Sequence, residues 1–196
     1  MLSTALIIPW SCVEDDCGGL QNQKINTVGI TVNNTLLLEG GYSIEKQLVA
    51  EEKVSYKRFG LQVLPEVAYL SMVKDKLKSS FISAAYACSP MSVSTEEIED
   101  IAIFSDEDYI QKNSQKIIVA GDTLNSLFNI YDYNSGRIVG LPDFLMDEGL
   151  EASEEGFILQ PAVAPEQEQK HEFTIHYRLT NGEYYEVSAE AIILQP

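Results

Sequence analysis

One turn near the C-terminus, with an alternating apolar pattern on both sides, constrains the fold most. Apolar residues take every second position of both arms: Phe173, Ile175, Tyr177 and Leu179, then Tyr185, Val187, Ala189 and Ala191. A period of two is typical of strands with one buried face. A two-residue turn at Asn181-Gly182 would pair Tyr177 with Glu186 and put carboxylates on the apolar face. A three-residue loop over 180–182 pairs Tyr177 with Tyr185, so we predict a type I turn with Gly182 left-handed in a bulge.

Further apolar runs between turn residues predict short strands along the rest of the chain. In VGITV, Val28, Ile30 and Val32 are expected to share one face. In FGLQV (59–63) the alternation continues until Pro65, which lacks a backbone donor and is expected to interrupt the strand. The other predicted strands are FISAAYAC (81–88), IAIF (Ile101–Phe104), KIIVA (Lys116–Ala120), LFNIY (127–131) and FILQ (157–160).

Two segments carry helix signals. Ser94 can cap a helix over STEEIEDI, because Glu97 follows three residues later. In LPDFLMDEG, Pro142 suits the first turn of a helix and Gly149 its end. The sequence therefore predicts an all-β, immunoglobulin-like antiparallel β-sandwich with one or two short helices and a C-terminal β-hairpin.

Charge narrows the classes of partner. The chain has 196 residues, which fit one domain, and 13 Lys and Arg oppose 30 Asp and Glu to give a net charge of −17. Nucleic-acid phosphates need a basic surface, so nucleic acid is not expected as a partner. Adsorption to anionic lipid is disfavoured for the same reason. The acidic surface either only keeps the protein soluble or attracts cations or basic partners.

The N-terminal segment predicts where the protein is located in the cell. Residues 2–10 are apolar but too few to span a bilayer, and they end at Ser11-Cys12. The segment resembles the end of a bacterial lipoprotein signal, in which small residues precede a cysteine that is then acylated. Pro9 and Trp10 fit that pattern poorly, and no basic residue precedes the run, so the true start could lie upstream. The alternative is a buried N-terminal strand with an incidental Cys12.

The residues after Cys12 extend this prediction. Glu14, Asp15 and Asp16 resemble the export signal of Bacteroidetes surface lipoproteins, which implies the outer face of the outer membrane. The polar residues that follow are typical of a tether. We therefore expect a signal segment at 1–11, an acylated cysteine with its tether at 12–26, and a single β-sandwich domain at 27–196.

Several motifs together resemble a family of Bacteroidetes outer-membrane lipoproteins of unknown function. They are AAYACSP, IEDIAIFSDEDY, AGDTLNSLF and FTIHYRLTNGEYYEVSAEAIIL. The resemblance covers most of residues 12–194 and implies a lipid-anchored, β-rich, extracytoplasmic domain. It carries no active site. With Cys12 acylated, Cys17 and Cys88 remain in an oxidising compartment, where they could form a disulfide or stay free thiols.

The search for chemistry yields few candidates. No phosphate loop and no hydrolase motif occurs, and no cofactor or metal is expected. His171 and His176 would face opposite sides of one strand, so they are expected at the surface rather than as a metal pair. Asp106 and Asp108 could hold calcium but lack EF-hand spacing, so a solvated acidic loop is the simpler interpretation.

Tyrosines and one threonine complete the candidates. Tyr131 with Tyr133, or Tyr184 with Tyr185, could line a platform for a sugar or peptide, or fill the core. Asp122-Thr123-Leu124 resembles the O-glycan acceptor motif of Bacteroidetes, a tripeptide that also arises by chance.

Two functions remain. The first is a non-catalytic binding, adhesion or assembly module with a protein or glycan ligand. The second is a hydrolase, for example one acting on carbohydrates, that uses paired carboxylates. A shallow surface lined by tyrosines would favour the first function, and a deep cleft with two facing carboxyls would favour the second.

Overall fold

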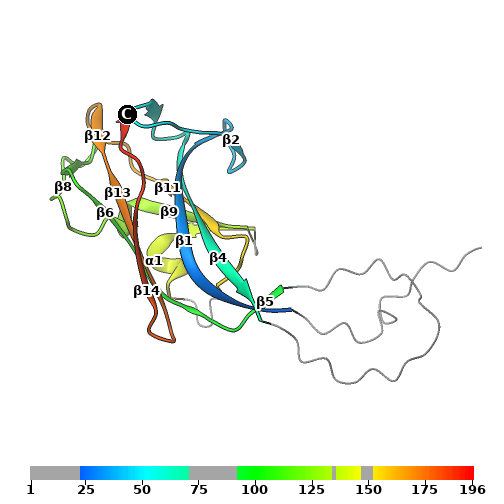
Figure 1. Cartoon of the computed structure of the whole chain (residues 1–196). Coiled ribbons are helices and arrows are strands. Elements are labelled where there is room, and N and C mark those ends of the chain that lie inside the picture. Colours follow the sequence, from blue (N-terminus) through cyan, green and yellow to red (C-terminus); the bar gives the residue numbers. More distant parts are fainter. Residues whose placement is uncertain (1–22, 71–91, 134–135, 147–151) are drawn as a thin grey trace, which may run out of the picture.

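The computed structural model describes residues 23–70, 92–133, 136–146 and 152–196, and strands dominate this part of the chain (Figure 1). The strands are β1 (Gln23–Leu37), β2 (Ile44–Gln47), β3 (Lys53–Ser55), β4 (Phe59–Tyr69), β5 (Ser92–Ser94), β6 (Ile98–Ser105), β7 (Tyr109–Ile110), β8 (Ile117–Ile118), β9 (Phe128–Asp132), β10 (Arg137–Gly140), β11 (Phe157–Pro161), β12 (Gln169–His171), β13 (Phe173–Leu179), β14 (Tyr184–Ser188) and β15 (Ile192–Gln195). The helices are the 3-10 helix η1 (Asn125–Leu127) and α1 (Leu141–Phe144).

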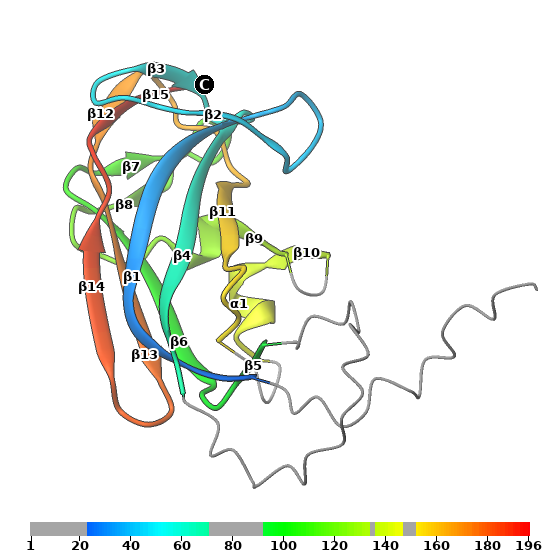
Figure 2. The ribbon, with the colours of Figure 1, turned by 45° about the vertical axis from the view of Figure 1, so that its right-hand side comes forward.

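Two sheets form the body of the fold. The larger has the order β10-β9-β11-β4-β1-β2, with β5 also paired to β1, and the smaller has the order β14-β13-β6. Figure 2 shows β1 and β4 as a long bent pair beside β13 and β14. Smaller sheets, β12-β15-β3 and β7-β8, lie at the edges of this body. Neighbouring strands are antiparallel except for β1 with β5 and β3 with β15, which are parallel.

Aromatic side chains join the two sheets. The Phe173 ring of β13 lies 5.6 Å from the Phe59 ring of β4 and 5.9 Å from the Phe128 ring of β9, between centroids. Phe157 of β11 stacks on Tyr177 of β13 at 6.4 Å. All five side chains are buried, and each such aromatic pair adds about 0.5–1.5 kcal/mol beyond its burial. The predicted all-β sandwich is confirmed.

The C-terminal hairpin confirms the predicted register. Tyr177 pairs with Tyr185 and Ile175 pairs with Val187, so the apolar positions of both arms share one face. Gly182 has φ +90°, in the left-handed region that a three-residue loop requires. β13 also pairs with β6 on its other side and is therefore the central strand of its sheet.

A β-bulge changes the predicted face of the first strand. Thr27 pairs with Val67 but Gly29 pairs with Glu66, so Val28 is an extra residue in β1. Ile30 and Val32 are buried as expected, but Val28 is 59% exposed, so the prediction that it shares their face is wrong. β1 also begins at Gln23, and residues 23–26, which we expected in the tether, therefore belong to the sheet.

Pro65 does not interrupt β4, contrary to the prediction. It pairs with Ile30 of β1, is buried, and lies well inside a strand that continues to Tyr69. Antiparallel pairing alternates between hydrogen-bonded and non-hydrogen-bonded positions, and at the latter a missing donor leaves no ladder bond unmade. Phe59, Leu61 and Val63 are fully buried, as expected.

The predicted helix from Ser94 is a strand instead. Ser94 ends β5, and the chain enters β6 at Ile98, which pairs with Leu179. Asp100 pairs with the adjacent Arg178, so the residue between Ile98 and Asp100 is unpaired in a bulge. Because of this bulge, Ile98 and Ile101 both point into the core although they are three residues apart. A spacing of three between buried residues is typical of a helix, which explains the wrong prediction.

The second predicted helix is α1, with Pro142 in its first turn as expected. The predicted end at Gly149 lies outside the described residues, and α1 ends earlier, at Phe144. KIIVA yields only the two-residue β8, with Ile117 53% exposed, so it is not the buried strand we predicted. FISAAYAC also lies outside the described residues, whereas β9 and β11 confirm LFNIY and FILQ.

Candidate functional site

A groove of about 500 Å³ lies where β1, β4 and β11 meet their connecting turns. Its lining residues come from the connection between β1 and β2, from the end of β3 and the turn before β4, and from the end of β11. The lining residues are Glu39, Gly40, Gly41, Tyr42, Ser55, Tyr56, Lys57, Arg58, Gln160 and Pro161.

Tyr42, a lining residue of the groove, belongs to a group of three tyrosines in contact. Tyr42 stacks on Tyr131 of β9, with ring centroids 4.9 Å apart and planes inclined by 24°. Tyr131 in turn meets Tyr133 edge-on at 5.3 Å and 81°. Burial raises the pKa of Tyr42, and a hydrogen bond with Asn129 lowers it by a smaller amount. We call the groove together with Tyr42 and Tyr131 the tyrosine groove.

The tyrosine groove lies on the outer face of the large sheet. Phe128 and Ile130 of β9 point into the core, so Tyr131, which directly follows Ile130, points outward. On the same outer face, Leu37 and Ile158 are fully buried although neither belongs to the main core cluster. A Cβ on Gly60 would lie 2.9 Å from Ile158 Cγ2 and 3.2 Å from Leu37 Cδ1, so glycine is needed for this close packing.

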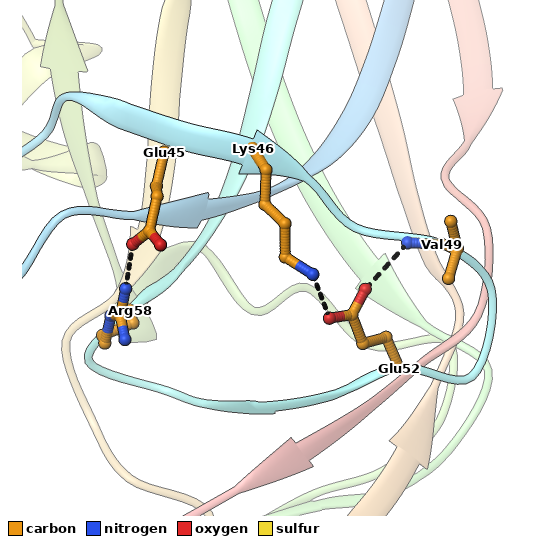
Figure 3. Close-up of polar contacts among 5 residues, drawn as sticks. All are labelled: Glu45, Lys46, Val49, Glu52 and Arg58. Carbon is orange, nitrogen blue, oxygen red and sulfur yellow. Dashed lines mark hydrogen bonds and ion pairs between the residues drawn. The ribbon is translucent and has the colours of Figure 1, made fainter.

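Arg58, in the turn before β4, lines the groove and is fixed by two hydrogen bonds. Its Nε donates a 3.0 Å hydrogen bond to the Leu37 carbonyl, and its Nη2 donates to the Glu45 carboxylate (Figure 3). The neighbouring backbone is fixed as well, because Gln160 Nε2 donates to the Lys57 carbonyl at 2.7 Å. Lys57 Nζ lies 6.0 Å from the centre of the Tyr56 ring, within cation–π range.

A second set of contacts in Figure 3 closes the turn after β2. Glu52 accepts from Lys46 Nζ at 2.5 Å and from the Val49 N–H at 3.2 Å. Both hydrogen bonds lower the pKa of Glu52, and the one from Lys46 has the larger effect. The turn contains Glu51 at φ +61°, and the Glu51 N–H donates to the Ala191 carbonyl at 2.7 Å. This turn is therefore tied to the C-terminal part of the fold.

The predicted tyrosine pairs have different outcomes. Tyr131 and Tyr133 do lie together, but neither is a lining residue of the groove. The rings that line it are Tyr42, which stacks on Tyr131, and Tyr56, and neither of these was predicted. Tyr184 and Tyr185 are adjacent in β14 and point to opposite faces. Tyr185 faces Tyr177 in the core, whereas Tyr184 is 50% exposed beside His176. These two cannot form one platform.

His171 is not at the surface, contrary to the prediction. It is fully buried, because its odd position places it on the face of Phe173 and Ile175. Its Nδ1 lies 2.9 Å from Ser105 Oγ, which also accepts a hydrogen bond from the Glu107 N–H. The Ser105 hydroxyl and His171 Nδ1 therefore share one buried hydrogen bond. Burial lowers the pKa of His171 to about 4, and this closed Ser–His pair is structural.

His176 fits the prediction better. Its side chain is 31% exposed on the outer face of β13, and Nε2 lies 3.3 Å from a carboxylate oxygen of Glu186. The Phe104 ring lies 4.3 Å from the imidazole, between centroids.

The two carboxylates considered for calcium bind backbone N–H groups instead. Asp106 Oδ1 accepts from the Glu172 N–H at 2.6 Å, and Asp108 Oδ1 accepts from the Ala120 N–H at 2.8 Å. Among the described residues, no group of three or more His, Cys, Asp or Glu is placed to hold a metal ion. The buried Glu96 accepts from the Thr27 N–H at 2.7 Å and from Asn181 Nδ2 at 2.9 Å, and so joins the β1 bulge to the C-terminal hairpin.

The remaining predicted residues separate into two groups. Thr123 is exposed, and its Oγ1 accepts from the Asn125 N–H at 3.3 Å. The predicted lipid, export and disulfide positions lie outside the described residues: Cys12, Glu14, Asp15, Asp16, Cys17 and Cys88. Within the described part of the chain, no helix is long and apolar enough to cross a membrane.

Comparisons with known proteins leave the family open. No family model and no curated protein matches the chain. A solved structure named BspA_C_mut is similar at a TM-score of 0.25 and 13% identity. The match covers 85% of this chain and 47% of the chain in that structure, so this chain spans about half of its length. Similarity at this level supports no conclusion about fold or function, so the proposal below rests on the chain's own residues.

Proposed function

We propose that this protein is a lipid-anchored, non-catalytic binding module of the cell surface. Its lipid is on Cys12, its export signal is Glu14, Asp15 and Asp16, and its ligand binds in the tyrosine groove. The observation that carries the proposal is the stacked pair Tyr42–Tyr131 beside an open groove. Concave sites that combine aromatic side chains with a few fixed polar groups are typical of ligand binding.

The position of the groove supports an anchored module. β1 starts at Gln23, where the N-terminal segment joins, and ends at Leu37, two residues before the groove begins at Glu39. Figure 2 shows the start of β1 beside β5, and β2 at the opposite end of the molecule. At ~3.3 Å per residue, β1 covers about 45 Å of chain. A lipid on the N-terminal side would therefore leave the groove at the far end from the membrane.

The lining of the groove favours binding over hydrolysis. Glycosidase chemistry needs two carboxyl groups about 5–10 Å apart across the scissile bond. Glu39 is the only carboxylate among the described residues that line the groove. The hydrolase alternative therefore has no carboxylate pair within this lining.

The anchor is tested by metabolic labelling with an alkyne-bearing fatty acid in a Bacteroidetes host. The wild-type chain and a Cys17→Ser control should incorporate the label, and Cys12→Ser should not. Replacing Glu14, Asp15 and Asp16 by Ala should keep the label but protect the protein from protease added to whole cells. An intact Met1 with an unmodified Cys12 in the native host would contradict the proposal.

The binding site is tested separately by thermal unfolding with a panel of sugars, amino acids and short peptides. A ligand that binds only the native state raises Tm. At least one compound should raise the Tm of the wild-type chain and not that of Tyr42→Ala. Tyr69→Ala, a change at an exposed tyrosine outside the groove lining, should behave as wild type. A panel that shifts both variants equally would show that the ligand binds elsewhere.

A further inference from the structure

We infer that the ligand of the tyrosine groove is a neutral oligosaccharide. This inference rests on the proposed binding function and goes further by naming the class of ligand. Four properties of the groove support it: the supported aromatic ring, the balance of charge, the mixture of donors and acceptors, and the pairing of β11, whose end lines the groove.

The aromatic ring is prepared for stacking. One face of Tyr42 is covered by Tyr131 at 4.9 Å, and Tyr42 also lines the groove. The C–H groups on one face of a pyranose ring form an apolar surface that packs on an aromatic face. Because Tyr131 already fixes the Tyr42 ring, binding costs little conformational entropy in ordering that side chain. Tyr42 is thus the contact residue, and Tyr131 is a positioning residue.

The charges that line the groove nearly cancel. Arg58 is paired with Glu45, which leaves Glu39 and Lys57 as side chains of opposite charge at the rim. A site for phosphate or uronic acid would need an excess of cations aimed inward, and a site for an amine would need an excess of carboxylates. The balanced lining suits an uncharged ligand.

The polar groups that line the groove suit hydroxyls, which both donate and accept. Arg58 uses Nε and one N–H of Nη2 within the protein, so the N–H groups of Nη1 and the second N–H of Nη2 remain as donors for a ligand. Gln160 uses Nε2 to bind the Lys57 carbonyl, so its Oε1 remains as an acceptor. Because both side chains are held by the protein, their positions are set before a ligand arrives.

The strand pairing disfavours an extended peptide. Peptides that bind by β-addition need a strand edge with unpaired backbone groups. β11 is paired with β9 along its whole length and with β4 over residues 157–159. At the lining end of β11, where the pairing with β4 has stopped, the Lys57 carbonyl is already bound by the Gln160 side chain. A volume of about 500 Å³ lies within the range of about 300–1,000 Å³ that is typical of small-molecule sites. A short run of sugar rings fits these limits.

The inference is tested with the full chain carrying Cys12→Ser in native gels that contain one polysaccharide each. The probes are neutral glucan, xyloglucan, galactomannan and mannan, with anionic polygalacturonate for comparison. At least one neutral polysaccharide should retard the protein. Calorimetry with the matching oligosaccharide should give a Kd that changes little between about 0.05 and 0.5 M NaCl, because no ion pair forms.

Variants assign the binding to the groove. Tyr42→Ala should weaken the affinity by about thirty-fold or more, as expected for a central aromatic contact. Tyr131→Phe keeps the stacked ring and should retain binding, whereas Tyr131→Ala should weaken it. Tyr184→Ala is the control, because that exposed tyrosine lies on β14, outside the groove lining. Circular dichroism and Tm verify that each variant is folded.

Three results would overturn the inference. They are retardation by none of the neutral polysaccharides, retardation by polygalacturonate alone, and sugar binding that Tyr42→Ala leaves intact. If the thermal screen instead finds a peptide or amino acid that requires Tyr42, the binding function stands and the sugar assignment fails. If no compound in either experiment requires Tyr42, both fail.

Discussion

The two faces of the large sheet are built for different purposes. The inner face is closed by the second sheet, and Phe59, Phe128 and Phe157 have exposures of 0 to 3%. The outer face also buries side chains, including Ile158, but there Tyr42 and Tyr131 stay partly exposed. The same strands supply both faces, since β9 contributes Phe128 to one and Tyr131 to the other.

The difference lies in what covers each face. The inner face is covered by a paired sheet whose backbone cannot move far, whereas one wall of the outer groove is a connecting turn, residues 39–42. Substitutions that meet fixed backbone should therefore be much more costly than substitutions that meet side chains below the groove.

Gly156→Ala should have the largest effect. Gly156 has φ +68°, and a Cβ there would lie 2.1 Å from the Val63 carbonyl oxygen, which is held in β4. We expect a loss of about 4 kcal/mol or more in the free energy of unfolding, from the left-handed backbone and the backbone overlap together. Urea unfolding measures this loss.

Gly182→Ala is the matched control for this prediction. Gly182 also has a left-handed φ, +90°, but a Cβ added there would have nothing within 4 Å. Its loss should be about 1–2 kcal/mol, from backbone strain alone. Equal losses in the two variants would mean that backbone strain, rather than contact with β4, decides the cost.

Protonation of the buried His171 should make the free energy of unfolding depend on pH. Its pKa is about 4 in the folded protein and about 6.5 when unfolded, so between these values the unfolded chain binds more protons. The free energy of unfolding should therefore fall by about 3 kcal/mol as the pH falls from 6.5 to 4. In His171→Gln this part of the acid dependence should be absent, as measured by urea unfolding across the window.

His176→Gln is the control, because that side chain is 31% exposed on the outer face of β13. It should keep the acid dependence of the wild type. A parallel decline in the wild type and in His171→Gln would assign the acid sensitivity to carboxylates instead.

Gly60→Ala tests the outer face. The new methyl group would meet Ile158 Cγ2 at 2.9 Å and Thr35 Oγ1 at 3.1 Å, which belong to side chains rather than to backbone. We expect a loss of about 1–3 kcal/mol, below that of Gly156→Ala, because side chains can shift. A loss as large as that of Gly156→Ala, measured by the same unfolding experiment, would show that the side chains packed on the outer face yield no more readily than the β4 backbone that Gly156 meets.

Lys46→Ala should have the smallest effect. It removes the exposed ion pair with Glu52, in which the Lys46 side chain is 50% exposed. Exposed pairs contribute about 0–1 kcal/mol, so we expect a change of at most ~0.5 kcal/mol that disappears in high salt. A larger loss would indicate that the turn after β2 supports the fold more than its exposure implies.

The sequence predicted the regular parts of the fold, and it failed where bulges interrupt the period of two. The hairpin register followed from alternation alone, because a shift would have placed Glu186 on the apolar face. Val28 and Ile98 were misplaced because an extra residue shifts the faces of a strand, and such an insertion depends on the partner strand. His171 was misplaced although its odd position matched the buried set of Phe173 and Ile175.

The candidate site was predicted only in part. Tyr131 and Tyr133 were singled out as neighbours in sequence, but the stacking partner Tyr42 lies about ninety positions away. A local signal did exist, because Tyr42 follows Gly40-Gly41 between two strands, and an aromatic residue in a glycine-rich turn is often exposed. The ion pair that fixes Arg58 depends on the approach of β2 to the turn before β4, which no local pattern encodes.

The antiparallel pairing of β1 and β4 has a mechanical consequence. A lipid anchor would pull on β1 at Gln23, while a tethered ligand would pull on β4 through the turn at Arg58, next to Phe59. These two points lie at opposite ends of the pair, because Ile25 is opposite Tyr69 and Leu36 is opposite Phe59. The force would slide the strands along each other, so that their hydrogen bonds carry it together instead of opening one after another. Geometry of this kind resists rupture under flow far better than an unzipping hairpin does.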